Sequence, residues 1–485
     1  MSPYLPAIRG SRLYIDITII TVYFVVMLTV GWLSRKQSVE SYWVAERRYG
    51  PLRITASMIA TIFGASSTIG IIGLGYSRGL TGAWWLLVGA GALIPFGLFL
   101  AARVRSLDVY TLPDILKNAY GNRVAVPAGL MISIAWCGVL AAQMVAAGRL
   151  LETIFNIDFS YALTVAAAVF ILYTFWGGQL SVIRTDLWQL ILFIGGLILC
   201  VILLFKFNAA DPFIWSNIPA DNLRFPVNES FGWYDLLVYY PLIVGLPYLV
   251  GPDIYSRVLC ARDNMTVRIA SITAAAVMIP LAIMLVAAGI LARAAFPGIA
   301  PESALPETFA VVIPAGLRGL IAAGFLGGIM SSADTVLLSA STIFTVNVIK
   351  PLFHLPERSC LGATKIFLLI FGIGGFTIAW YEQGIISSLL IGYTVFVGGV
   401  VFPTLAALFK SKLKVSSSAA LWAVIIGGGT AVMGKLADGC IMKTILTSSG
   451  SQMLQSILGP QYLSLLPLIL SLLVLITLSV IMKKS

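Results

Sequence analysis

Long apolar segments recur along the whole chain, and they constrain its fold more strongly than any other feature of the sequence. About 13 segments have roughly the 20 residues that an α-helix needs to cross the hydrocarbon core of a bilayer. Only 11% of the 485 residues are charged and 59% are hydrophobic, whereas about 25% of residues are charged in soluble domains. Because backbone polar groups in lipid need partners within their own segment, the sequence predicts an all-α polytopic membrane protein. The predicted spans are 14–33, 54–76, 80–101, 124–148, 160–177, 187–206, 233–251, 269–293, 310–349, 364–380, 385–409, 418–435 and 461–481.

The basic residues predict how these spans are oriented. Most of the 31 Lys and Arg residues fall in loops that share one side of the membrane if the chain starts outside, and cytoplasmic loops are enriched in Lys and Arg. The first apolar run is long enough to span and lacks a small-residue cleavage site, so we expect a retained helix and not a signal peptide. We therefore expect an integral protein of a bacterial-type inner (plasma) membrane, with the N-terminus outside and the C-terminus in the cytoplasm. Basic loops account for the net charge of +11, so no nucleic-acid partner is expected.

Residue types that serve catalysis or structural metal sites are sparse. His354 is the single histidine, and the five cysteines are scattered without a Cys-x-x-Cys pair. This pattern disfavours Ser-His catalysis and multi-histidine zinc sites, and it predicts that the cysteines are small core residues. The sequence therefore does not predict an enzyme.

A polar cluster interrupts the ninth predicted span. Segment 324–335 (GFLGGIMSSADT) places adjacent hydroxyls and a carboxylate among apolar residues, and polar groups at membrane depth are costly unless they bind a ligand or line a cavity. Ser331, Ser332 and Thr335 supply oxygen donors, which suit a small hard cation. The segment therefore predicts an ion-binding helix.

Two other spans are interrupted near their middle. These interruptions are 60–70 (ATIFGASSTIG) in the second span and 245–253 (GLPYLVGPD) in the seventh. Broken helices at corresponding positions of two halves are typical of inverted-repeat transporters. The alternative for each segment taken alone is an ordinary packing glycine or a proline kink.

These segments resemble the sodium:solute symporter family, which includes sodium-coupled carriers of proline, sugars, sialic acid and choline. The residues that carry the resemblance are 60–70, 75–79, 173–186, 251–257 and 330–335. The Gly-Gly…Thr-Asp motif within 173–186 and the Met-Ser-Ser motif at 330–332 are the most specific.

The resemblance implies a LeuT-type fold in a single transporter domain over 1–485. An extra N-terminal helix at 14–33 would precede a first repeat of five helices at 54–206. An inverted second repeat of five helices would follow at 233–409, with two peripheral helices at 418–481.

The resemblance also implies where sodium binds. The ion would lie between the break of the second span and the ninth span. Its ligands would be the backbone carbonyls of Ala60, Phe63 and Gly328 and the hydroxyls of Ser331 and Ser332. Unwound backbone offers carbonyl oxygens that no helix hydrogen bond uses, and five neutral oxygens make a weak site that can release its ion.

A second cation site is one of three interpretations of two carboxylates. Asp186 matches an acidic position near such a site in some family members, and its partners there correspond to Asp334 and Thr335. Members that bind two sodium ions tend to have a hydroxyl where Asp334 places a carboxylate. Asp334 therefore strengthens a second cation site, binds a proton, or pairs with a nearby base.

The solute is expected beside the two breaks, where half-helix ends leave free N–H and C=O groups. Each candidate also has a structural alternative, such as a hydroxyl bonded to its own helix, an amide that joins helices or a packed ring. Because no charge is apparent at the first break, a neutral or zwitterionic solute is favoured. Asp253 and Arg257 are expected to pair with each other, as a cytoplasmic closing pair or as an ordinary i,i+4 helix pair. The candidate solute ligands are Ser66, Ser67, Thr68, Gln143, Tyr248, Trp136 and Trp85.

The function that these features favour is sodium-coupled symport of a small organic solute by alternating access. Sodium, the solute and the lipid bilayer are the expected partners. The alternatives are a membrane receptor or sensor on a transporter scaffold and a proton-coupled transporter.

Overall fold

The computed structural model describes residues 10–36, 38–436 and 462–482. In this part of the chain the structure is helical and contains no β-strand. Ten helices there are long and apolar enough to cross a membrane, or up to eleven if a pair bent by 46° counts as one span. That pair is α17 (Ile385–Gly399) and α18 (Val401–Leu408). The predicted all-α membrane architecture is confirmed, whereas the predicted number of 13 spans is not.

The difference in number arises in two continuous helical stretches that each cover two predicted spans. The helix α9 (Phe159–Ala209) has 51 residues, about 76 Å at 1.5 Å per residue, which far exceeds the roughly 30 Å of a bilayer core. Gly178 lies inside α9 with φ 55° and ψ −167°, a conformation that glycine adopts without strain. The stretch Ser66–Ser106 contains a similar point at Gly79, with φ 67°. Each glycine lies where two predicted spans meet.

The N-terminal half contains the first interruption. Its helix α3 ends at Ile62, and the chain resumes helical form at Ser66. The helices of this half are α1 (Gly10–Leu33), α2 (Val39–Val44), α3 (Pro51–Ile62), α4 (Ile71–Arg78), α5 (Trp84–Pro95), α6 (Ala101–Ser106), α7 (Leu112–Tyr120), α8 (Asn122–Phe155) and α9, with the shorter turns η1 (Ala45–Arg47), η2 (Ser66–Gly70), η3 (Gly79–Ala83) and η4 (Phe96–Leu100).

The C-terminal half contains the second interruption, between α10 and α11. Gly251 is extended, with φ −65° and ψ 134°, because the proline at 252 disfavours helical backbone at the residue before it and lacks an N–H group. The helices are α10 (Leu246–Val250), α11 (Pro252–Val258), α12 (Asn264–Ala295), α13 (Ala304–Val311), α14 (Leu317–Ile343), α15 (Lys350–Phe353), α16 (Glu357–Tyr381), α17, α18, α19 (Lys410–Leu413), α20 (Ser417–Leu436) and α23 (Tyr462–Ile481). The turns are η5 (Pro212–Asn217), η6 (Ala220–Leu223), η7 (Asp235–Tyr239), η8 (Pro241–Gly245), η9 (Pro301–Ser303) and η10 (Phe344–Ile349).

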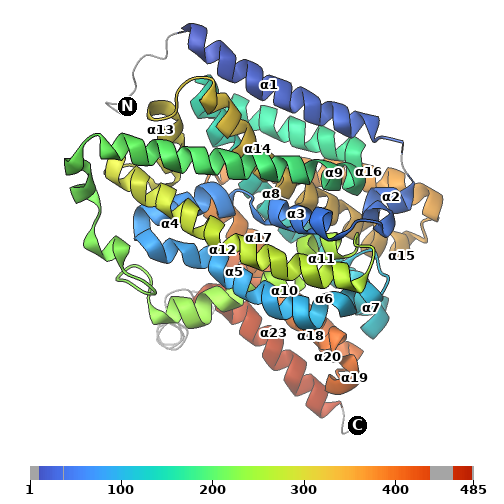
Figure 1. Ribbon diagram of the computed structural model, residues 1–485. Coiled ribbons are helices and arrows are strands. Elements are labelled where there is room, and N and C mark those ends of the chain that lie inside the picture. Colours follow the sequence, from blue (N-terminus) through green and yellow to red (C-terminus); the bar gives the residue numbers. More distant parts are fainter. Residues whose placement is uncertain (1–9, 37, 437–461, 483–485) are drawn as a thin grey trace.

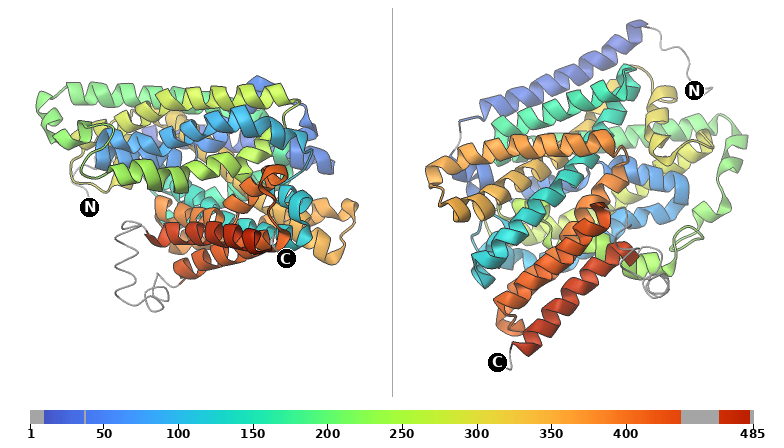
Figure 2. Two further views of the ribbon diagram at one scale, coloured as in Figure 1. Left: turned by 90° about the horizontal axis from the view of Figure 1, so that it is seen from below. Right: turned by 180° about the vertical axis from the view of Figure 1, so that it is seen from behind.

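The helix α14 forms the centre of the bundle and is buried along nearly its whole length. It packs against α9, α8, α3 and α11, so the polar segment 330–335 faces protein and not lipid. The helix α1 covers the outer side of α9 and α14, while α20 and α23 pack together against α17. Figure 2 shows α1 and α23 on opposite edges of the molecule. The interior therefore consists of the two broken segments, α8, α9 and α14.

Candidate ion and solute site

The polar segment of α14 contacts the first helix break directly. The Ser332 hydroxyl donates to the carbonyl oxygen of Thr61 at 2.6 Å and lies 3.4 Å from that of Ala60. These carbonyls belong to the last turn of α3, where helix termination leaves them without a partner in the helix. A Cβ atom built on Gly328 would lie 2.7 Å from the carbonyl oxygen of Phe63, so α14 approaches this end of α3 very closely. The structure thus brings four of the five predicted sodium ligands to one place.

Ser331, the fifth predicted ligand, is adjacent in sequence but has a different partner. Its hydroxyl donates to Oδ1 of Asp186 at 2.6 Å. Asp186, on α9, also accepts a hydrogen bond from the Ser57 hydroxyl of α3. The two serine hydroxyls of α14 therefore join the end of α3 to α9.

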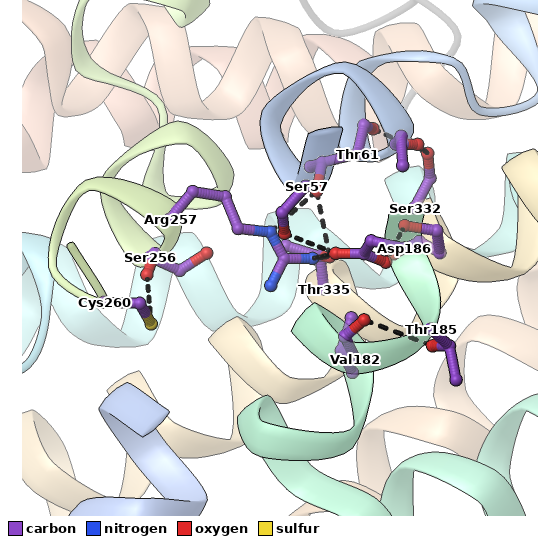
Figure 3. Close-up of polar contacts among 12 residues, drawn as sticks. Ser57, Thr61, Val182, Thr185, Asp186, Ser256, Arg257, Cys260, Ser332 and Thr335 are labelled. Atoms are coloured by element: carbon purple, nitrogen blue, oxygen red, sulfur yellow. Dashed lines mark hydrogen bonds and ion pairs between the residues drawn. The ribbon is translucent and has the colours of Figure 1, made fainter. Parts of the chain in front are cut away.

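A fully buried arginine lies beside this junction (Figure 3). Arg257 of α11 donates from Nε to the Thr61 hydroxyl at 2.8 Å, and Nη2 donates to the Thr335 hydroxyl. Nη2 also lies 3.6 Å from Oδ2 of Asp186. Arg257 therefore pairs with Asp186 on α9, and the expected pairing with Asp253 is not the arrangement that the structure shows.

Asp334 is buried but lies outside the Arg257 pair. Its Oδ1 accepts a hydrogen bond from the Thr174 hydroxyl at 2.7 Å. Its Oδ2 has no hydrogen-bond partner in the described part of the chain. Asp186 and Asp334 bring two negative charges to this region and Arg257 brings one positive charge. An unpaired charge in a protein interior is costly, so the cluster as it stands favours one further positive charge.

A cavity lies next to the ion region and is lined by residues of both helix breaks. Its volume is about 50 Å³, which is space for a handful of water molecules. Ser332 of α14 borders the cavity, so the ion region and the cavity share a wall. Six of the seven predicted solute ligands line it: Ser66, Ser67, Trp85, Trp136, Gln143 and Tyr248.

Two of the predicted ligands stabilise the broken backbone. Thr68, the one candidate that does not line the cavity, donates its hydroxyl to the carbonyl of Gly64 at 2.7 Å. This is the structural alternative expected for a membrane threonine. Gln143 accepts a hydrogen bond from the N–H of Ala65 at 2.7 Å. The Gln143 amide therefore joins α8 to the first break and also borders the cavity.

Asp253 and Tyr393 line the cavity but were not among the predicted solute ligands. Asp253 follows the second break directly, and its Oδ1 accepts a hydrogen bond from Nε1 of Trp136 at 2.6 Å. Its position one residue after Gly251-Pro252 was a usable signal, because residues that follow a break border the same space as the break. Tyr393 comes from α17, more than 100 residues from either break, and no pattern in its own span distinguishes it.

Two interrupted helices around a cavity, with a polar region between one break and a continuous central helix, define a secondary transporter of LeuT-type fold. The fold agrees with the solved structure of the substrate-bound outward-open state of a Na⁺-coupled sialic acid symporter. The two share a TM-score of 0.73 at 19% identity, over 95% of this chain and 97% of that one. The sequence model of the Sodium:solute symporter family matches residues 42–427, and the chain belongs to this family.

Curated relatives agree with this assignment. The chain is 24% identical over 475 residues to the human protein named Sodium/glucose cotransporter 4, covering 86% of this chain and 68% of the relative. It is 26% identical over 397 residues to Sodium/proline symporter 2 of Staphylococcus saprophyticus, covering 76% of each. The chain is thus a sodium-coupled solute symporter of the membrane and not an enzyme.

Proposed function

We propose that sodium binds where the end of α3 meets α14, with Ala60, Phe63, Gly328, Ser331 and Ser332 as ligands. The observation that supports this most strongly is the hydrogen bond of the Ser332 hydroxyl to the carbonyl oxygens at the end of α3. Those carbonyls have no partner in the helix, and they need only rotate slightly to face a cation instead of a hydroxyl. Ser331 and Ser332 can then turn their lone pairs toward the ion.

The solute binds in the cavity between the breaks, and the ion site and the cavity are coupled through shared residues. Thr61 and Ser332 border the cavity, and Ser332 also bonds to the backbone at the end of α3. A sodium ion that fixes this backbone also fixes one wall of the cavity. Such shared structure links the binding of ion and solute, as alternating access requires.

The predicted membrane arrangement remains part of this proposal. The N-terminus lies outside a bacterial-type inner membrane and the C-terminus lies in the cytoplasm. The segments 54–206 and 233–409 form two inverted repeats within one domain over 1–485, with 14–33 and 418–481 as added helices. The interruptions in the first and second repeats support this division.

Of the proposed second cation residues, Asp186 and Thr335 contact Arg257 in the structure. Asp334 keeps an oxygen without a partner. We therefore infer that Asp334 is the group that takes up a second positive charge, as a proton or a second sodium ion. A proton at Asp334 corresponds to the proton-coupled alternative.

The sodium site can be tested without knowledge of the solute. Purified protein is titrated with NaCl against KCl at constant ionic strength, and the midpoint of thermal unfolding is recorded. Sodium at about ten times its dissociation constant stabilises the native state by about 1.4 kcal/mol, and potassium should not. Ser332→Ala should raise the sodium concentration needed by roughly tenfold or more, because loss of one polar partner costs about 1–3 kcal/mol.

Ser339→Ala is the matched control, because it removes a hydroxyl from the same helix without a contact to the end of α3. Equal sodium titrations of the two variants would contradict the assignment of ligands. Sodium-dependent binding of a solute without its uptake into proteoliposomes would favour the receptor alternative.

A further inference from the structure

The solute cavity carries an uncompensated negative charge. Asp253 is the only residue with a charged side chain among the residues that line it. Its expected partner Arg257 is one helical turn further along α11, but the Arg257 guanidinium bonds to Thr61 and Thr335 and pairs with Asp186. Among the ion pairs of the described residues, none includes Asp253. A carboxylate without an ion-pair partner in this cavity favours a cationic ligand, because an opposite charge nearby stabilises its ionised form.

The position of Asp253 is fixed by an aromatic neighbour. Nε1 of Trp136 donates to Oδ1 of Asp253 at 2.6 Å. Trp136 is itself held by Phe396, with ring centroids 4.9 Å apart and an interplanar angle of 76°. Asp253 remains partly exposed, so this hydrogen bond orients the carboxylate without removing it from the cavity.

Aromatic rings surround the same space. Trp85, Trp136, Tyr248 and Tyr393 line the cavity together with Asp253. The faces of aromatic rings attract ammonium groups, most strongly where water is excluded. A carboxylate and several aromatic rings within one small cavity thus provide the chemistry that recognises an organic ammonium ion.

The polar groups of the cavity suit other solutes less well. The Gln143 carbonyl oxygen accepts from Ala65, and the Ser332 hydroxyl donates to the carbonyl of Thr61. These two contacts use part of the polar lining, and none of the other residues that line the cavity has a basic side chain. A solute with a net negative charge would meet the Asp253 carboxylate and no basic side chain in this cavity.

We propose that the solute is a small organic cation whose ammonium group lies between the Asp253 carboxylate and the indole rings of Trp85 and Trp136. This inference rests on the proposed function, because it takes the cavity as the solute site. It replaces the earlier expectation of a neutral or zwitterionic solute. That expectation was based only on the absence of charge at the first break. The charge that selects the solute comes from the second break.

The test compares charged solutes with neutral molecules of the same shape. Binding to the purified full-length protein is measured by calorimetry in NaCl for choline and its neutral analogue 3,3-dimethylbutan-1-ol. A second pair is piperidinium and tetrahydropyran, and trimethylglycine serves as the zwitterion. We expect the ammonium member of each pair to bind about tenfold or more tightly than the neutral one, since such contacts contribute about 1–2 kcal/mol. Choline should bind more tightly than trimethylglycine.

Variants of Asp253 test whether the preference for ammonium solutes depends on its carboxylate. Asp253→Asn keeps an oxygen that can accept from Trp136 but removes the charge, and it should abolish the preference for the ammonium member. Asp253→Glu should keep the preference. Asp235→Asn is the control, because Asp235 bonds to the N–H of Gly232 and does not line the cavity; it should leave the preference unchanged.

Several results would overturn the inference. They are equal binding within both pairs, binding of trimethylglycine as tight as that of choline, no binding of either ammonium compound, or an unchanged preference in Asp253→Asn. The comparison of solutes on the wild-type protein stands even if that variant does not fold. Failure of the proposed function looks different, because binding would then be the same when potassium replaces sodium, whatever the charge of the solute.

Discussion

Arg257 connects α11 to three other elements of the site. Its guanidinium reaches the hydroxyls of Thr61 on α3 and Thr335 on α14 and lies beside Asp186 on α9. One of its nitrogens, Nη1, is buried without a partner in the described part of the chain. A buried ion pair adds little net stability over an apolar pair, but removal of one partner strands the other charge. The stability of the protein should therefore fall when a single partner of Arg257 is replaced.

Asp186→Asn should destabilise the protein strongly. The variant removes the one carboxylate that is ion-paired with the buried Arg257, and breaking a buried pair from one side costs about 3–5 kcal/mol. We expect a large fall in the midpoint of thermal unfolding in detergent and a lower folded yield. Adding Arg257→Met should recover part of the loss, since both charges are then absent.

Asp221→Asn is the control for this prediction. It removes the partner of Arg224 in a pair at 3.3 Å, where the arginine side chain is 65% exposed. Exposed pairs contribute about 0–1 kcal/mol, so the unfolding midpoint should change little. If the unfolding midpoint fell by a similar amount in the two variants, the buried pair would contribute no more to stability than the exposed one.

Asp334→Asn should change the number of cations that move with each solute. Two carboxyl groups and one guanidinium are buried in this region, and Oδ2 of Asp334 has no hydrogen-bond partner among the described residues and is available to a further positive charge. We expect the variant to bind sodium at the α3–α14 site but to transport about one cation fewer per solute. The reversal potential of solute flux in proteoliposomes, measured with sodium and pH gradients separately, reports this ratio. A ratio equal to that of the wild type would remove Asp334 from the ion pathway.

At the scale of helices, the sequence predicted the features that depend on local backbone chemistry. The breaks after Ile62 and at Gly251 occur where glycine, proline and hydroxyl residues cluster. The partner of Arg257 was not predictable, because Asp186 is 71 positions earlier in the sequence and only the packing of α9 and α11 against α14 selects it over Asp253. Tyr393 was missed for the same reason. The predicted count of 13 spans is not confirmed, because helical conformation continues on both sides of Gly79 and Gly178 and length alone does not separate the neighbouring spans there.

The first break depends on close approach of three elements at Gly64. A Cβ atom there would lie 2.5 Å from Oε1 of Gln143 and 2.6 Å from Oγ of Ser332. Gly64→Ala should therefore displace both side chains and weaken sodium and solute binding together, by about 1–3 kcal/mol. Sodium titration of thermal stability measures the first effect and calorimetry the second.

Gly91→Ala provides the matched control for Gly64. Gly91 lies on α5, and a Cβ atom there would meet no atom within 4 Å. We expect unchanged sodium and solute binding in this variant. If Gly64→Ala behaved in the same way, the close packing at the break would have no role in binding.

At the scale of the whole molecule, the arrangement separates a buried transport core from peripheral helices. The helix α14 lies at the centre, while α1, α20 and α23 lie at the edges (Figure 2). Figure 1 shows the start of α1 and the segment of η5 and η6 at one end of the bundle, with the end of α23 at the other. Which of these ends faces the cytoplasm stays a prediction from the basic loops.

The orientation can be tested by labelling from one side of the membrane. Arg262 and Arg224 have side chains that are 60% and 65% exposed, and they lie in loops predicted to be on opposite sides. A membrane-impermeant maleimide added outside should label Arg224→Cys and not Arg262→Cys until the membrane is opened. The four described native cysteines are buried, and the unsubstituted protein gives the background. The reverse pattern would invert the proposed topology.

The short helix α11 places Asp253 and Arg257 one turn apart, so one rigid element contacts both the solute cavity and the ion network. If the solute binds at Asp253 as proposed, a displacement of α11 there also moves the guanidinium beside Asp186. Thermodynamic reciprocity then sets a condition on the transporter: the factor by which sodium tightens solute binding equals the factor by which the solute tightens sodium binding. Through the seven residues of α11, the binding of sodium would then change the binding free energy of the solute, and the solute that of sodium.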